Sequence, residues 1–277
     1  MSKRKRQRMS NQRKRYAQVG VGGRSQMFTR AILDDFKDHA ELVALCDRNS
    51  GRLAMRRDEA ARKTSQPPAT YAPADFDRMV AETRPDTVIV TTQDSDHEYY
   101  ICRAMELGCD AITEKPMTID AGKCQRIIDT VKKTGRNCRV TFNYRYAPPR
   151  SQIKNLLMSG LIGEVHSVDF QWLLNTHHGA DYFRRWHRNK ANSGGLLVHK
   201  ATHHFDLVNW WLSSVPDTVH ARGSRCFYLP ETADRMGLKR RGERCLDCGE
   251  ADNCPFRLDI AGSPGMKSVY LDHERHD

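Results

Sequence analysis

The sequence predicts an α/β fold, with an N-terminal doubly wound parallel sheet and a C-terminal α+β domain that carries an open, mostly antiparallel sheet. Over residues 16–25 a short apolar strand runs into a glycine turn and the start of a helix. Apolar strands and helical segments then alternate as far as residue 143, and the alternation is lost from about residue 144. Strands and helices that alternate at these lengths are typical of a doubly wound parallel sheet.

The glycine turn has the pattern of a dinucleotide-binding turn. Gly20 allows the chain to turn tightly, and Gly22 has no Cβ, so a pyrophosphate can approach the backbone. The helix that begins at about Arg24 directs its free N–H groups and its positive dipole end at that pyrophosphate. Ser25 occupies the third small position, where glycine or alanine is usual. Taken alone, the pattern is equally compatible with an ordinary turn.

The second strand, residues 41–47, adds context to the turn because it ends in Asp47. An acid near this distance from the first glycine binds the ribose hydroxyls of a dinucleotide. The strand, turn, helix and acid together predict a Rossmann domain over residues 16–143. The carboxylate of Asp47 repels a 2′-phosphate, so we expect NAD as the cofactor, while Arg24 and Arg48 leave NADP open.

The remaining elements of this domain follow in alternation. We expect helices at residues 50–64, 74–82, 97–107 and 119–134, and strands at residues 86–92, 110–113 and 138–143. The strand at 86–92 is continuously apolar, as expected for a parallel sheet that is covered on both faces. Gly108 and Gly135 follow two of the helices and are suitable C-caps.

Residues 144–277 are expected to form the second domain, for substrate binding and oligomerisation. The pattern predicts helices at 148–160 and 200–213, strands at 164–175 and 218–227, a polar aromatic loop at 176–195, and a loop-like charged region over the last fifty residues. We expect this domain to be incomplete, either because the protein is a natural short form or because the chain is part of a longer protein.

Charge is concentrated at the N-terminus. The formal net charge is +11, and eight cations without an acid lie within residues 1–15, so the rest of the chain carries only +3. We expect residues 1–15 to be a disordered, solvated arm, with contact to nucleic acid as the alternative. Apolar runs stay below the roughly 18 residues of a membrane span, so we expect no membrane association.

The nine cysteines favour reduced thiols and a cytoplasmic location, because five of them are scattered through the predicted Rossmann domain. Cys245, Cys248 and Cys254, together with Cys226, are close enough in sequence to suggest a structural zinc site. The spacing is incomplete for zinc, so we prefer reduced thiols or a loop clip and predict no metal in the functional site.

Six short motifs occur in one order along the chain. They are Gly20-Val-Gly-Gly, Cys46-Asp47, Thr91-Thr92-x-Asp94-x-x-His97, Glu114-Lys115-Pro116, Asn143-Tyr-Arg145 and Gly194-Gly195 followed by His203-His-Phe-Asp206. In this order, over about residues 16–225, the chain resembles the glucose–fructose oxidoreductase / inositol dehydrogenase family (Gfo/Idh/MocA). The resemblance implies an NAD(P)-dependent oxidoreductase that transfers a hydride between the nicotinamide and a sugar, cyclitol or sugar-derived alcohol. It also implies that Lys115 lies by the nicotinamide and that His203 is the acid/base.

Elementary chemistry agrees with these two roles. Lys115 directly follows a parallel strand and therefore lies at the carboxyl edge of the sheet, where ligands bind. An ammonium there can polarise a carbinol or carbonyl oxygen, and a neutral imidazole is a suitable base for a secondary alcohol. Because the two residues come from different domains, we expect the reacting carbon to lie in the cleft between the domains. The chain departs from the family that it resembles at His199, where many members carry an aspartate, so a His–Asp relay is not expected.

The candidate site residues fall into three groups. The predicted catalytic residues are Lys115 and His203. The predicted cofactor-binding residues are Gly20, Gly22, Gly23, Arg24, Ser25, Asp47, Arg48, Thr91, Thr92, Asp94, His97, Glu114, Lys115 and Asn143. The substrate candidates are Arg145, Tyr182, Trp186, His199, Lys200 and His204.

Two other function classes stay open. One is a glycosidase that keeps NAD bound and cleaves by transient oxidation, as some proteins of similar sequence do. The other is a non-catalytic Rossmann-fold binding or regulatory protein. We expect a sugar-like small-molecule substrate, no nucleic-acid partner, and a homo-oligomer if the full second-domain sheet is present.

Overall fold

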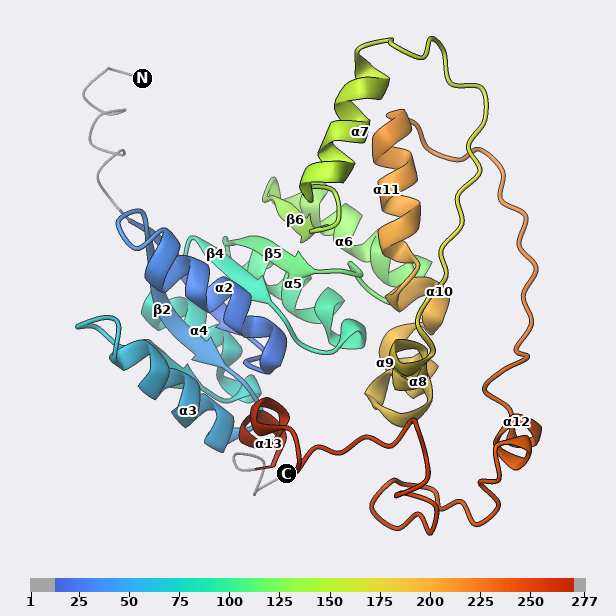
Figure 1. Cartoon of the computed structure of the whole chain (residues 1–277). Helices are drawn as coiled ribbons and strands as arrows, with labels where there is room; N and C mark the ends of the chain where they lie inside the picture. Colours follow the sequence, from blue (N-terminus) through green and yellow to red (C-terminus); the bar gives the residue numbers. More distant parts are fainter. Residues whose placement is uncertain (1–12, 272–277) are drawn as a thin grey trace. The chain divides into compact units, whose positions relative to one another are not determined.

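The computed structural model describes residues 13–271. The chain forms two compact units (Figure 1). The first extends to Thr141 and also contains the segment from Ile260 onward, and the second comprises Phe142–Asp259. The sequence pattern predicts one domain over residues 144–277, whereas this division places its last part with the first unit. The difference arises because helix α13 (Pro264–Tyr270) packs on the first unit, where its Val269 is 8 % exposed.

The first unit is built on a six-stranded parallel sheet with the order β3-β2-β1-β4-β5-β6. The strands are β1 (Lys14–Val19), β2 (Ala40–Cys46), β3 (Ala69–Tyr71), β4 (Thr87–Val90), β5 (Asp110–Glu114) and β6 (Cys138–Thr141). β1 pairs with both β2 and β4, so the strand order reverses beside β1. Ligands of such sheets bind at this switch point, outside the carboxyl ends of the strands. The predicted parallel α/β sheet is confirmed; β3, only three residues long, was missed.

Short and long helical segments connect the strands. They are η1 (Gly23–Ser25), α2 (Gln26–Arg30), η2 (Ala31–Asp35), α3 (Ser50–Ala61), η3 (Pro73–Asp75), α4 (Phe76–Thr83), η4 (Asp94–Asp96), α5 (His97–Glu106) and α6 (Ala121–Thr134). The side chain of Asn49 caps α3 by accepting a bond from the N–H of Arg52 at 2.7 Å. Gly135, with φ of +65°, ends α6 in the left-handed conformation that favours glycine.

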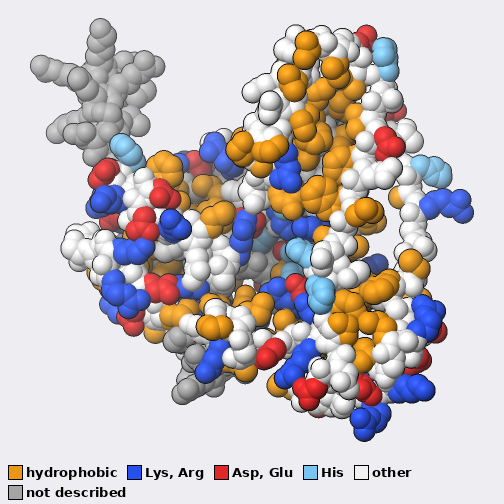
Figure 2. All heavy atoms as spheres, in the orientation of Figure 1, with side chains coloured by type: hydrophobic (Ala, Val, Ile, Leu, Met, Phe, Trp, Pro, Cys, Tyr) orange, Lys and Arg blue, Asp and Glu red, His pale blue; other side chains and the backbone are white. Residues whose placement is uncertain are grey.

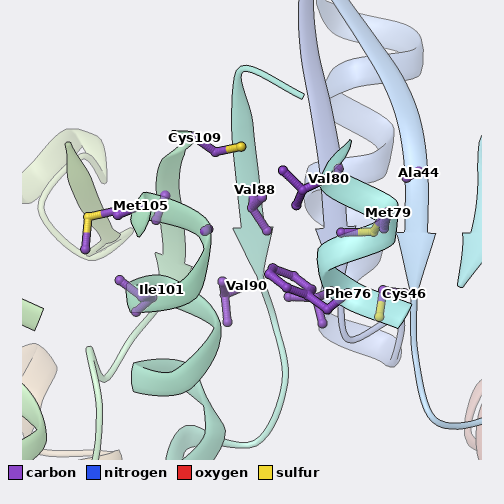
Figure 3. Packing of buried hydrophobic residues seen from close by; sticks show 14 of the residues in the cluster. Ala44, Cys46, Phe76, Met79, Val80, Val88, Val90, Ile101, Met105 and Cys109 are labelled. Carbon is purple, nitrogen blue, oxygen red and sulfur yellow. The ribbon is translucent and has the colours of Figure 1, made fainter. Parts of the chain in front are cut away.

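Two apolar clusters cover the two faces of the sheet. Along β4, Val88 and Val90 belong to one cluster and Ile89 to the other, because successive side chains of a strand point to opposite faces. On the first face, Phe76 of α4 and Ile101 of α5 pack beside these valines (Figure 3). This two-sided burial explains the continuous apolar run of β4.

The first strand begins earlier than the sequence predicted. Lys14 and Arg15 belong to β1, where they pair with Ala40 and Glu41 of β2, and are not part of a solvated arm. The backbone N–H of Arg15 donates to the carboxylate of Asp86 at 2.8 Å. The guanidinium of Arg15 lies 3.6 Å from the carboxylate of Glu41, so this charged side chain has a partner on β2. The rest of the predicted arm, residues 1–12, lies outside the described residues.

The second unit is helical where it has regular structure. Its segments are α7 (Pro148–Met158), α8 (Thr176–Arg184), η5 (Trp186–Arg188), α9 (Lys190–Ser193), α10 (Leu196–His199), α11 (Thr202–Leu212) and α12 (Pro230–Arg235). α7 packs on α11, and the ammonium of Lys154 donates to the carbonyl of Trp210 at 2.6 Å. The predicted helices at 148–160 and 200–213 are present, whereas the predicted loop at 176–195 contains short helices.

Between residues 142 and 259 the structure describes no strand, although the sequence predicted strands at 164–175 and 218–227. An extended segment becomes a strand only when a neighbour pairs with its backbone, and these two have no such neighbour among residues 13–271. Apolar side chains of the first segment are accordingly exposed, Leu173 at 95 % and Trp172 at 44 %. Figure 2 shows hydrophobic side chains gathered over α7 as well.

No helix within residues 13–271 combines the length and the apolar character that a membrane span requires. All nine cysteines are free thiols in the structure.

Candidate functional site

The glycine turn explains the residue type at each of its positions. Gly20 has φ of +81°, and a Cβ placed on it would lie 2.6 Å from the backbone of Thr91 and Thr92. Only glycine therefore fits where the turn passes the end of β4. A Cβ on Gly22 would meet nothing within 4 Å, so the backbone there is open to a ligand.

Ser25 replaces the usual third glycine or alanine without disturbing the turn. Its side chain is 1 % exposed, and its hydroxyl donates to the carbonyl of Gly22 at 2.6 Å. Thr91, the residue after β4, supports the turn, since its hydroxyl donates to the carbonyl of Gly20 at 2.5 Å. The hydroxyl of Ser25 thus forms a bond within the turn, and that of Thr91 connects the turn to the end of β4.

Asp47 lies at the carboxyl end of β2 and joins it to the turn. Its carboxylate accepts from the N–H of Val21 at 2.6 Å and from the N–H of Asn49 at 2.9 Å. The guanidinium of Arg52 is 3.6 Å away. Each carboxylate oxygen can accept more than one hydrogen bond, so Asp47 retains capacity for ribose hydroxyls. Arg48, the next residue, is exposed.

Glu114 connects three parts of the same sheet edge. Its carboxylate is 2.8 Å from the guanidinium of Arg24, accepts from the hydroxyl of Thr141 at 3.2 Å, and accepts from the N–H of Lys115 at 3.2 Å. The turn, β6 and the residue after β5 are thereby held together. Lys115 precedes Pro116 through a cis peptide bond.

Behind this edge lie two buried titratable residues, Asp94 and His97. His97 is 1 % exposed, and its ring nitrogens are 2.9 Å from the carbonyl of Pro116 and 3.2 Å from the carbonyl of Thr92. Burial raises the pKa of Asp94 to about 7, against the opposing charges of His97 and Lys115. His97 therefore fixes the two loops that carry Thr92 and Lys115.

The residues present fit a dinucleotide in the first unit. The turn lies at the switch point of the sheet, its backbone is open at Gly22, and an acid at the end of β2 faces it. Of the predicted cofactor-binding residues, thirteen lie in this unit around or behind the turn; Asn143 is exposed and belongs to the second unit.

In the second unit His203 lies near the start of α11, stacked on an aromatic ring. Its ring centroid is 3.9 Å from that of Tyr144, with 9° between the planes, and the residue is 4 % exposed. The ammonium of Lys200 is 3.3 Å from the hydroxyl of Tyr144, and the guanidinium of Arg150 is 4.1 Å from the centre of its ring. The sequence analysis did not identify Tyr144 or Arg150 as site residues, although Tyr144 lies within the motif Asn143-Tyr-Arg145.

His204 adjoins the same group. Its ring lies 4.5 Å from that of Trp172, centroid to centroid. Burial, followed by the charges of Lys200 and Arg150, lowers the pKa of His204. The lowered pKa of His204 favours its neutral imidazole, the form that accepts a proton.

Three other substrate candidates come together in a second aromatic group. The ring of His199 lies 5.8 Å from that of Tyr182 and 5.4 Å from that of Trp186. His187 lies between them, 4.5 Å from His199. Arg145 is engaged elsewhere, because its guanidinium donates to both carboxylate oxygens of Asp206, one of them at 2.8 Å.

The cysteine-rich segment forms no metal-binding group in the structure. Over residues 13–271 no three histidine, cysteine or acidic side chains converge in a way that would hold a metal ion. Cys245 accepts a bond from the N–H of Leu258 at 3.4 Å.

Comparison with known proteins gives matches over most of the chain. Residues 14–142 match the model of an oxidoreductase family with an NAD-binding Rossmann fold (GFO_IDH_MocA), and residues 154–249 match the C-terminal alpha/beta domain of that family. YteT of Bacillus subtilis, named as an oxidoreductase, is 37 % identical over 255 residues, which are 92 % of this chain and 59 % of YteT. The chain therefore spans less than two thirds of that relative.

A second relative carries a different kind of name. Glycosyl hydrolase family 109 protein 1 of Akkermansia muciniphila is 28 % identical over 67 % of this chain and 40 % of its own length. Among solved structures, myo-inositol 2-dehydrogenase of Lactobacillus plantarum has a TM-score of 0.61 at 21 % identity, covering 73 % of this chain and 57 % of that one. This likeness shows the fold.

Proposed function

This chain belongs to the Gfo/Idh/MocA oxidoreductase family, and we propose that it transfers a hydride between NAD(P) and a sugar, cyclitol or sugar-derived alcohol. The observation that carries the proposal is the turn itself. The proposal is supported by a glycine with positive φ packed against the end of β4, an open backbone at Gly22 and a buried acid at the end of β2, a combination that suits a dinucleotide.

We propose NAD as the preferred cofactor. The carboxylate of Asp47 faces the turn from the position of the ribose acid, and a second negative charge on the ribose would meet it at close range. Dissociation constants for NAD and NADP test this preference. A tenfold preference for NADP, which is about 1.4 kcal/mol, would contradict it.

In this proposal, Lys115 and His203 carry the chemistry. When bound, the nicotinamide accepts or donates the hydride. His203 takes the hydroxyl proton of the alcohol, a role supported by its burial and by its stacking on Tyr144. Lys115 holds the charge that develops on the substrate oxygen, supported by its place after β5 and by the bond of its N–H to Glu114.

The test is a dehydrogenase screen with a panel of sugars, cyclitols and sugar acids and with both cofactors, followed by substitutions. His203→Ala and Lys115→Ala should each lower the rate at least about 100-fold while NAD affinity changes less. The exposed His166→Ala and Lys133→Ala are matched controls and should keep the wild-type rate. Near-normal turnover of His203→Ala would move the base to His199, His204 or Lys200.

A glycosidase that works by transient oxidation is the second candidate, because one relative is named as a glycosyl hydrolase. Release of an aglycone from a glycoside without net reduction of free NAD would identify it. Turnover of free NAD with an unmodified sugar would support the oxidoreductase instead.

A cytoplasmic location and a homo-oligomer stay predictions. Nine free thiols are compatible with a reducing compartment.

A further inference from the structure

The C-terminal helix α13 packs beside the dinucleotide turn, although it follows the last strand of the sheet by more than a hundred residues. The hydroxyl of Ser268 lies 3.8 Å from the sulfur of Met55 on α3, and Val269 is buried. Figure 1 shows α13 next to the end of α3. Both observations place residues 264–270 on the first unit, on the side of the sheet edge where Asp47 lies.

Tyr270 is the residue of α13 that reaches the turn. Its hydroxyl lies 3.5 Å from the position that a Cβ on Gly23 would occupy. Its ring faces the guanidinium of Arg52, 5.9 Å from the ring centre, and Arg52 in turn is 3.6 Å from the carboxylate of Asp47. Tyr270 thus contacts the surroundings of both the phosphate turn and the ribose acid.

The polar end of Tyr270 is available for a ligand. Within residues 13–271 no hydrogen bond is found for its hydroxyl, which lies beside Gly23, the residue after the open Gly22. A phenol hydroxyl can donate to a phosphate oxygen, and bonds to charged acceptors are stronger than those between neutral groups. The cation of Arg52 fixes the ring without using the hydroxyl.

From this geometry we propose that α13 forms one wall of the dinucleotide site and that Tyr270 binds the cofactor, its hydroxyl donating to the pyrophosphate at the glycine turn. The inference rests on the proposed function, because it requires that the turn binds a dinucleotide. It assigns to the site a residue that lies outside the region from residue 14 to residue 142 that matches the Rossmann-fold family model.

The test is a titration of the full chain with NAD and with ADP, in which binding is measured by calorimetry or intrinsic fluorescence. Tyr270→Phe removes only the hydroxyl and should weaken NAD and ADP alike, by about tenfold, or about 1.4 kcal/mol. Adenosine, which has no phosphate, should bind both proteins equally. Tyr99→Phe is the matched control, because Tyr99 lies in the same unit and is 56 % exposed.

Unchanged NAD and ADP affinity in Tyr270→Phe, with tight binding by the wild type, would overturn the role of Tyr270 and leave the proposed function standing. Tighter binding in Tyr270→Ala would show that α13 obstructs the site and would also overturn the inference. Failure of the wild-type chain to bind any dinucleotide would overturn the proposed function itself, and the inference with it.

Discussion

At the scale of single residues, Tyr144 is the support of His203. The two rings stack at 3.9 Å, and the hydroxyl of Tyr144 lies 3.3 Å from the ammonium of Lys200. The aromatic face orients the imidazole, and the hydroxyl orients the ammonium. Tyr144 is therefore a positioning residue in the proposed reaction.

Substitutions at Tyr144 should separate these two effects. Tyr144→Leu removes the stack and should lower kcat about tenfold or more with little change in NAD affinity, whereas Tyr144→Phe keeps the stack and should lose less. Steady-state kinetics and an NAD titration measure both. Tyr146→Leu, at a neighbouring tyrosine that is 72 % exposed, is the control. Equal rates for Tyr144→Leu and the wild type would show that the stack has no role.

The raised pKa of Asp94 predicts how the stability of the folded chain depends on pH. Burial raises its pKa to about 7 in the folded chain, whereas an unfolded aspartate titrates near pH 3.9. Between these values the folded state holds the extra proton, so this group makes the protein less stable as pH rises from about 4 to about 7, by at most about 1.4 kcal/mol per pH unit.

Asp94→Asn should abolish that contribution and flatten the profile of unfolding free energy in this range. Denaturant unfolding at several pH values measures it, with the exposed Asp96→Asn of the same segment as the control. A profile of Asp94→Asn parallel to that of the wild type would contradict the assignment.

At the scale of elements, the turn between β1 and α2 depends on Gly20. A side chain there would combine a left-handed φ of +81° with contacts of 2.6 Å to the backbone of Thr91 and Thr92. Gly108 has a comparable φ of +90°, but a Cβ on it would meet nothing within 4 Å. The two positions therefore have a similar φ but differ in the space that a Cβ would find.

Gly20→Ala should destabilise the chain by about 2 to 4 kcal/mol, and Gly108→Ala by about 1 kcal/mol, since only the first adds a steric clash to backbone strain. Denaturant melts without cofactor measure both. Similar losses for the two variants would mean that the end of β4 moves aside for the methyl group.

At the scale of the whole molecule, the first strand of the sheet includes two charged residues, Lys14 and Arg15, before its apolar part. Arg15 donates its N–H to Asp86 and places its guanidinium 3.6 Å from Glu41. A chain that starts at Arg13 should bind NAD like the full chain, because it keeps the whole of β1.

A chain that starts at Tyr16 loses two residue pairs between β1 and β2, together with the contacts of Arg15 to Asp86 and Glu41. Its melting temperature should be several degrees lower than that of the chain that starts at Arg13. Thermal unfolding with and without NAD compares the three chains. Equal melting temperatures for the two shortened chains would contradict a structural role for Lys14 and Arg15.

The sequence by itself determined the parallel sheet and the place of the cofactor turn. These features depend on local signals, namely the apolar runs of β1, β2 and β4, the glycines of one short turn, and an acid that ends a strand. Such signals lie within a few residues of one another, so their pattern can be read without knowing what packs against them.

Only the tertiary structure decided which distant residues meet. Tyr144 stacks on His203, 59 positions further along the chain, and Tyr270, near the end of the described chain, lies beside Gly23. Lys14 pairs within the sheet, although the segment around it has the composition of a charged arm. The segment at 164–175 is the converse case: its pattern suits a strand, yet it lacks a pairing partner among the described residues. Pairing and long-range packing depend on what the rest of the fold brings near, and no local pattern contains that information.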